Sequence, residues 1–145
     1  MNGIRSAGLL AAMASIAAGV ILAPAALGFA GYQAGPYTGA TEQDEEIRFR
    51  AGEWQMKRLN AVAYADCKNG RRQRIEVDDG RTMIDDSRFE LELTGPSDLE
   101  VTVTGRIQGD DATGRLEASV RPSGGLCTAD LRWRAERIER AASRR

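Results

Sequence analysis

Hydrophobic and polar residues alternate along most of the chain, and the clearest example covers residues 126–137. One set of alternate positions in this segment is apolar or small, namely Cys127, Ala129, Leu131, Trp133 and Ala135, and the positions between them are polar. A repeat of two residues places the two sets on opposite faces of an extended chain. We therefore predict a β-strand with one buried face, centred on Trp133, that closes the fold.

The same alternation recurs in shorter segments after residue 46. These are 47–51, 72–77, 82–84, 88–94, 99–104 and 115–120. Turn-forming sequences such as Asn69-Gly70, Asp78-Asp79-Gly80 and Gly95-Pro96 separate them, and the segment 54–67 has apolar residues in both phases, which indicates a two-sided strand or a bulge. The pattern predicts an all-β antiparallel meander of about seven or eight strands that closes as a small barrel, with a two-sheet sandwich as the alternative.

The N-terminal segment has a different pattern. Residues 6–41 contain no charged residue, and Arg5 precedes them. A basic residue followed by an apolar, alanine-rich stretch is typical of a secretory signal peptide, and Gly28 or Ala30 offers a cleavage site. We divide the chain into a signal helix at 1–30, a linker at 31–36, a β domain at 37–137 and a charged tail at 138–145. The domain is then extracytoplasmic, either periplasmic or secreted; the alternative is an uncleaved single-pass anchor, and only then would the chain contact a membrane.

Two cysteines, Cys67 and Cys127, are the only ones in the chain. Each lies in phase with the apolar residues of its own segment, and their wide separation is unlike that of a catalytic Cys-x-x-Cys pair. Because the signal directs the chain to an oxidising compartment, we predict that the two cysteines form a structural disulfide.

Three short motifs give the chain a resemblance to known proteins. They are Tyr-x-Gly-x-Thr from Tyr37, Ile-x-Phe from Ile47, and Cys-x5-Trp-x-Ala-x-Arg from Cys127 to Arg137. In this pattern the chain resembles small exported bacterial β domains of unassigned function. The resemblance implies an exported β domain and assigns no catalytic residue.

Composition removes several kinds of chemistry. The chain has no histidine, so templates that use a histidine base or a histidine zinc ligand do not apply. Candidate carboxylates for a metal site or an acid–base pair are Asp78, Asp79, Asp85 and Asp86. They adjoin turn residues, where Asp commonly bonds backbone N–H groups, so we interpret them as turn caps and predict no catalytic residue, metal site or cofactor. A calcium-binding domain or a carboxylate-dependent extracytoplasmic enzyme is the alternative.

The leading functional hypothesis is a non-catalytic binding domain. The formal net charge is -1, and the basic cluster at residues 71–74 has no interleaved aromatic residue, so we predict no nucleic-acid partner. The partner would be a small apolar ligand inside the sheet or an envelope protein on the charged strand faces. The following residues are candidates either to line a ligand cavity or to form the core: Phe49, Leu91, Val101 and Trp133. A filled interior would favour binding at the surface.

Overall fold

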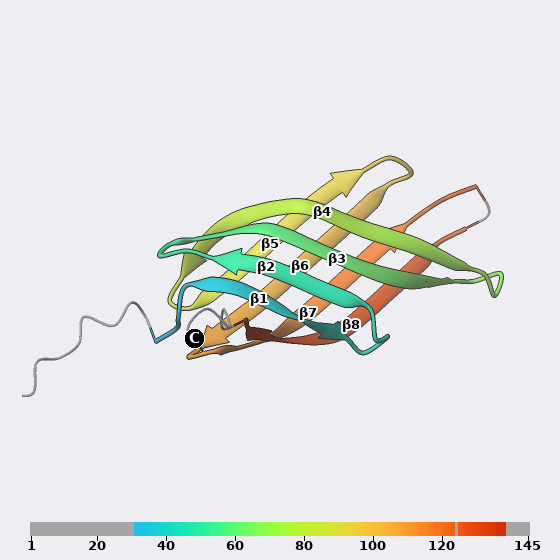
Figure 1. Ribbon diagram of the computed structural model, residues 1–145. Helices are drawn as coiled ribbons and strands as arrows, with labels where there is room; N and C mark the ends of the chain where they lie inside the picture. The colour runs from blue at the N-terminus through green and yellow to red at the C-terminus, as the bar shows by residue number, and fades with distance from the viewer. Residues whose placement is uncertain (1–30, 124, 139–145) are drawn as a thin grey trace, which may run out of the picture.

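In the part of the chain that the structure describes, eight antiparallel β-strands follow one another in chain order and close into one ring-like sheet (Figure 1). The computed structural model describes residues 31–123 and 125–138. The strands are β1 (Gly35–Thr41), β2 (Glu46–Ala51), β3 (Gln55–Cys67), β4 (Arg72–Asp85), β5 (Arg88–Gly95), β6 (Leu99–Gln108), β7 (Asp111–Val120) and β8 (Cys127–Arg137). The all-β antiparallel meander predicted from the sequence is confirmed, and β8 pairs with β1 to close the ring.

Two segments differ from the sequence prediction. Asp78-Asp79-Gly80 is not a turn between two strands; it lies inside β4, which is continuous over 14 residues. The register between β3 and β4 shifts between Leu59 and Ala61, so Asp78 and Asp79 form a β-bulge that keeps the strand paired on both sides of it. The first strand begins at Gly35, within the expected linker, because residues 35 and 36 already pair with β2. The predicted signal helix and nearly all of the charged tail lie outside the described residues.

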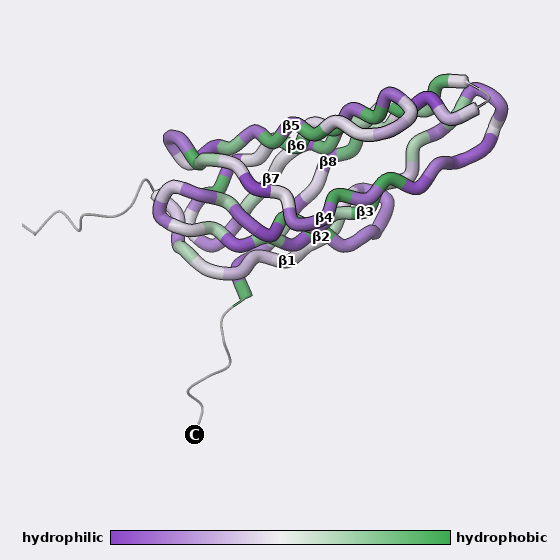
Figure 2. Tube along the Cα trace, turned by 90° about the horizontal axis from the view of Figure 1, so that it is seen from above, coloured by the Kyte–Doolittle hydropathy of each residue, from purple (hydrophilic) through white to green (hydrophobic). Residues whose placement is uncertain are grey.

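Seen from above, β5 and β6 lie on the side of the ring opposite to β1 to β4 (Figure 2). Apolar side chains from alternate positions of every strand fill the space between them. At one level Phe89, Gly105, Gly114 and Trp133 stand in register across β5, β6, β7 and β8. A Cβ atom on Gly105 would lie 2.4 Å from Phe89 Cζ and 2.7 Å from Trp133 Cζ2. The two glycines therefore leave the room that the two aromatic rings occupy.

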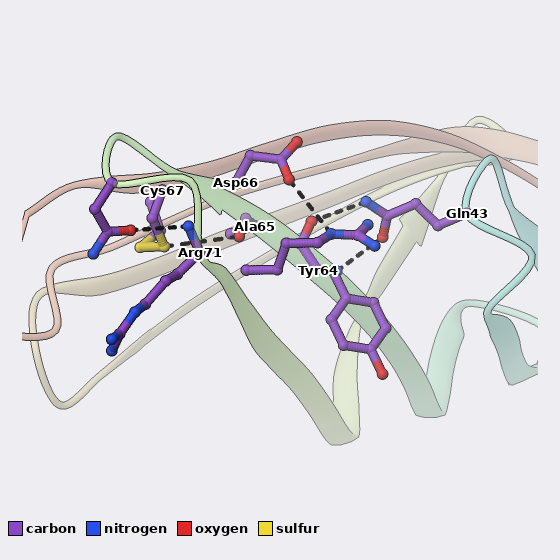
Figure 3. Close-up of polar contacts among 9 residues, drawn as sticks. Gln43, Tyr64, Ala65, Asp66, Cys67 and Arg71 are labelled. Atoms are coloured by element: carbon purple, nitrogen blue, oxygen red, sulfur yellow. Dashed lines mark hydrogen bonds and ion pairs between the residues drawn. A yellow bond between two sulfur atoms is a disulfide. The ribbon is translucent and has the colours of Figure 1, made fainter.

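The β1–β2 hairpin is short and lies between β3 and β8, because β2 pairs with β3 and β1 pairs with β8. Its turn is joined to β3 by the Gln43 side chain, whose Nε2 donates to the Tyr64 carbonyl (2.9 Å) and whose Oε1 accepts from the Tyr64 N–H (2.8 Å) (Figure 3). On the other side, the Glu42 N–H donates to the Arg132 carbonyl (2.9 Å), and the Arg132 N–H donates to Glu42 Oε1. Beyond the turn of this hairpin, β3 and β8 pair directly.

The predicted disulfide lies where these two long strands meet. Cys67 and Cys127 are opposite each other in the register of β3 and β8, and their sulfur atoms are bonded. The prediction is confirmed. The disulfide links β3 to β8 at the end of the sheet where the β1–β2 hairpin no longer lies between them. Within residues 31–123 and 125–138, no helix has the length and hydropathy needed to cross a bilayer.

Candidate binding surface

The four residues predicted as core or ligand-lining are all buried. Phe49, Leu91, Val101 and Trp133 are each exposed by no more than 5%. The Phe49 and Trp133 rings are in edge contact with centroids 5.9 Å apart, while Leu91 and Val101 pack further along β5 and β6. Burial of large apolar side chains in mutual contact is the ordinary arrangement of a core.

An aromatic cluster fills the barrel around Phe49. The ring of Tyr37 stacks on Phe49 with centroids 5.1 Å apart, and Phe89 packs against Phe49 (5.6 Å) and Trp133 (6.0 Å). Tyr37 donates its hydroxyl hydrogen toward the backbone carbonyls of Gln33 (2.6 Å) and Gly109 (3.1 Å). Burial, and secondarily the charge of Asp110, raises the pKa of Tyr37 to about 12. The level of the barrel with the most aromatic residues is therefore occupied by the protein's own rings.

A groove of about 430 Å³ lies on the outside of the barrel, over β1, β2 and the first half of β3. Strand pairing brings its lining together, because Pro36 stands opposite Arg50, and Thr38 opposite Arg48. The lining residues are Pro36, Tyr37, Thr38, Glu46, Arg48, Phe49, Arg50, Arg58, Asn60 and Ile138. The groove thus combines three guanidinium groups with the carboxylate of Glu46, small polar groups and the exposed side chain of Ile138.

A β-bulge in β3 shapes the middle of this surface. Between the pairs Arg48–Asn60 and Arg50–Lys57, β2 contributes one residue, Phe49, and β3 contributes two, Arg58 and Leu59. The extra residue breaks the alternation, so Lys57 and Arg58, although consecutive, are both exposed. Arg58 adopts a φ of 54°, in the left-handed region that non-glycine residues seldom occupy.

The side chain of Asn60 holds this conformation. Its Nδ2 donates to the Arg58 carbonyl (2.9 Å), and its Oδ1 accepts from the backbone N–H of Asp79 (3.2 Å). Asp79 belongs to the bulge in β4 and also has a positive φ, of 51°. One amide side chain therefore fastens two neighbouring bulges to each other, and it orients the backbone that carries Arg58.

Three of the four cations on this surface have no carboxylate partner in the part of the chain that the structure describes. Arg48 forms an exposed ion pair with Glu46 (3.5 Å). Among the described residues, no carboxylate forms an ion pair with Arg50, Lys57 or Arg58. We call Arg50, Lys57 and Arg58 the cationic patch. It fits an anionic group, because a guanidinium offers several N–H donors in a planar fork.

The aspartates named from the sequence do not converge on a metal site. Asp78 and Asp79 lie in the β4 bulge, where Asp79 also pairs with Arg81 (3.2 Å), and Asp85 and Asp86 lie at the β4–β5 turn. All four are exposed. Across residues 31–123 and 125–138, no group of three or more His, Cys, Asp and Glu side chains is arranged to hold a metal ion.

Sequence reasoning missed the cationic patch as a unit. The alternation at 47–51 places Arg48 and Arg50 on the outer face, but it does not reveal their neighbours on β3, because the consecutive residues Lys57 and Arg58 would face opposite sides of a regular strand. The available signal was the segment 54–67, whose mixed phase indicated a bulge without fixing its position. Comparison with known proteins finds no match, neither to a protein-family model nor to a curated protein.

Proposed function

We propose that this chain is an exported, non-catalytic binding domain that recognises an acidic segment of an envelope partner through the groove and its cationic patch. The observation that carries the proposal is the position of the groove. It lies on the outer face of β1 to β3, where Arg50 and Arg58 are exposed and have no carboxylate partner within the described residues.

The packing of the interior favours this surface over a small apolar ligand. The rings of Tyr37, Phe49, Phe89 and Trp133 contact one another across the barrel. A ligand inside the ring of strands would have to displace several of these side chains, and removing one buried aromatic ring from a core costs about 3–5 kcal/mol. A surface site requires no such rearrangement.

The export part of the proposal has two supports. A disulfide between Cys67 and Cys127 is compatible with an extracytoplasmic location, because reducing compartments keep most thiols free. Arg5 and the uncharged, apolar stretch that follows it are also typical of a secretory signal peptide, and the chain resembles small exported β domains in its short motifs. Protein exported through the secretory pathway should have lost the residues up to Gly28 or Ala30. N-terminal sequencing checks this, and an intact Met1 in a membrane fraction would indicate the anchor instead.

A labelled oligoglutamate peptide tests the binding site. We expect binding by fluorescence polarisation, and we expect Arg50→Glu/Arg58→Glu to raise the dissociation constant by about tenfold or more, because two attractive contacts become repulsive. The matched control is Arg88→Glu/Arg106→Glu. These two exposed arginines stand opposite each other on β5 and β6, and they too have no ion pair within the described residues.

The control separates a site from general charge attraction, because both double variants change the net charge equally. If both double variants weaken oligoglutamate binding equally, the proposal is contradicted. It is also contradicted if wild type does not bind the peptide at low salt. Saturable binding of a fluorescent fatty acid to the native protein would favour the apolar-ligand hypothesis in its place.

A further inference from the structure

Strand β4 has a free edge over much of its length. It pairs with β3 from Arg72 to Met83, with two shifts of register, but it pairs with β5 only at Ile84 opposite Phe89 and Asp85 opposite Arg88. Figure 1 shows the two strands diverging from that point. Within the described residues, no strand pairs with the other edge of β4 between positions 72 and 79.

Alternation of the backbone fixes which groups this edge presents. The Cys67 N–H donates to the Arg71 carbonyl (2.8 Å), so Arg71 has its carbonyl directed at β3. In an antiparallel pair every second residue directs both its N–H and its carbonyl at the same neighbour. The backbone groups of Gln73 and Ile75 therefore point to β3, and those of Arg74 and Glu76 point away from it, toward the free edge.

The charges along this edge follow a self-complementary order. The residues whose side chains project from the outer face are Arg72, Arg74, Glu76 and Asp78, two cations followed by two anions, and all four are exposed. In an antiparallel pairing with an identical strand about a two-fold axis at Ile75, Arg74 of each copy stands opposite Glu76 of the other, and Arg72 opposite Asp78. Every outward pair is then of opposite charge, which favours pairing.

We propose that a second copy of this chain docks on the free edge of β4 in this register, so that the two sheets become continuous across a two-fold axis. The proposal does not depend on the groove or its ligand. A shift of one residue is excluded, because it would place edge-directed backbone groups opposite inward-directed ones. A symmetric register moved by two residues places Arg74 opposite Arg74, or Glu76 opposite Glu76, on the two-fold axis. Like charges then stand opposite each other, which disfavours that register.

The pairing fits an isologous dimer, since the same residues contribute from both copies. It involves few residues and no large apolar area, because Ile75 and Val77 are already buried inside each barrel. We therefore expect a reversible dimer that dissociates on dilution and weakens with salt, since exposed charges are screened. The Arg74–Glu76 ion pair within one strand, at 2.6 Å, is replaced by contacts of the same chemistry between copies.

Charge reversal gives a decisive test. The purified chain is examined by sedimentation equilibrium over a concentration series at low salt, as wild type and as the variants Arg74→Glu, Glu76→Arg and Arg74→Glu/Glu76→Arg. Either single reversal creates two like-charge pairs and should raise the dimer dissociation constant by about tenfold or more. The double reversal restores opposite charges in every pair and should dimerise like wild type. Mixing the two single variants should give a heterodimer.

Arg106→Glu, on the outer face of β6, is the control for a change of net charge alone, and circular dichroism checks that each variant is folded. A wild type that stays monomeric throughout would overturn the proposal. So would single variants that dimerise like wild type, or a double variant that does not regain association, because the dimer would then use another surface. Loss of oligoglutamate binding in the groove variants has no bearing on this result.

Discussion

Asn60 and Asp79, on neighbouring strands, are joined by a hydrogen bond in which the Asp79 backbone N–H donates to Asn60 Oδ1 at 3.2 Å. The same side chain donates from Nδ2 to the Arg58 carbonyl at 2.9 Å. Arg58 and Asp79 both have a left-handed backbone. One amide therefore stabilises two bulges that neither strand would form by alternation alone.

Replacing Asn60 by Ala should lower both stability and binding. The change removes two hydrogen bonds at a partly exposed site, and we expect a loss of about 1–2 kcal/mol in the free energy of unfolding, measured in urea. Because Arg58 loses its support, oligoglutamate should also bind more weakly. Asn60→Asp keeps the acceptor for the Asp79 N–H and loses the donor to the Arg58 carbonyl. The free energy of unfolding of this variant should therefore lie between those of wild type and Asn60→Ala. An unchanged urea midpoint for both variants would contradict this role.

The sequence was sufficient for the parts of the fold that depend on local alternation. The strand from Cys127 to Arg137 begins one residue later than expected, and the phase of the two cysteines led correctly to their disulfide. Both inferences use only which face each residue occupies. Burial of one face is a property of the strand itself, so it leaves a mark in the sequence.

The positions of the bulges and the free edge left no such mark, since the mixed phase of 54–67 indicated a bulge without locating it. A bulge changes the register against a neighbouring strand, and it is fixed by the bonds of Asn60 across β3 and β4 as much as by Asp78 and Asp79 themselves. The Asp78-Asp79-Gly80 sequence therefore suggested a turn, the commoner use of those residues. The divergence of β4 from β5 arises from how eight strands close into a ring, which no single segment records.

Gly105 is predicted to be essential for packing. An added Cβ would lie 2.4 Å from the ring of Phe89 and 2.7 Å from that of Trp133, both of them in the filled core. Gly105→Ala should therefore lower the free energy of unfolding by about 1–3 kcal/mol through overpacking. Gly95→Ala is the matched control, because the nearest atom to its Cβ would be Leu99 Cδ2, the end of a flexible side chain, at 3.1 Å. Equal effects of the two substitutions on the urea midpoint would show that the aromatic rings yield easily.

The Cys67–Cys127 disulfide should contribute strongly to stability. It closes a separation of 60 residues, and in the chain-entropy model a loop of that size contributes about 4 kcal/mol. Cys67→Ala/Cys127→Ala removes the crosslink without leaving a free thiol, and we expect a lower urea midpoint for the folded variant. Wild type measured with a reductant should approach the variant's midpoint. Two thiols that alkylate freely in native protein under oxidising conditions would contradict the bond.

Tyr37 should make the protein sensitive to alkali. Burial raises its pKa to about 12, so the folded state keeps the phenol protonated where the unfolded chain ionises near a pKa of about 10. A pKa raised on folding gives stability that is complete below about pH 10 and is lost as the pH rises toward 12. Tyr37→Phe should be less stable at pH 8, because its hydrogen bonds to Gln33 and Gly109 are lost, yet its stability should fall less steeply above pH 10. The measurement is the free energy of unfolding against pH, with the phenolate absorbance of the two proteins compared. A difference spectrum that titrates near pH 10 would contradict the assignment.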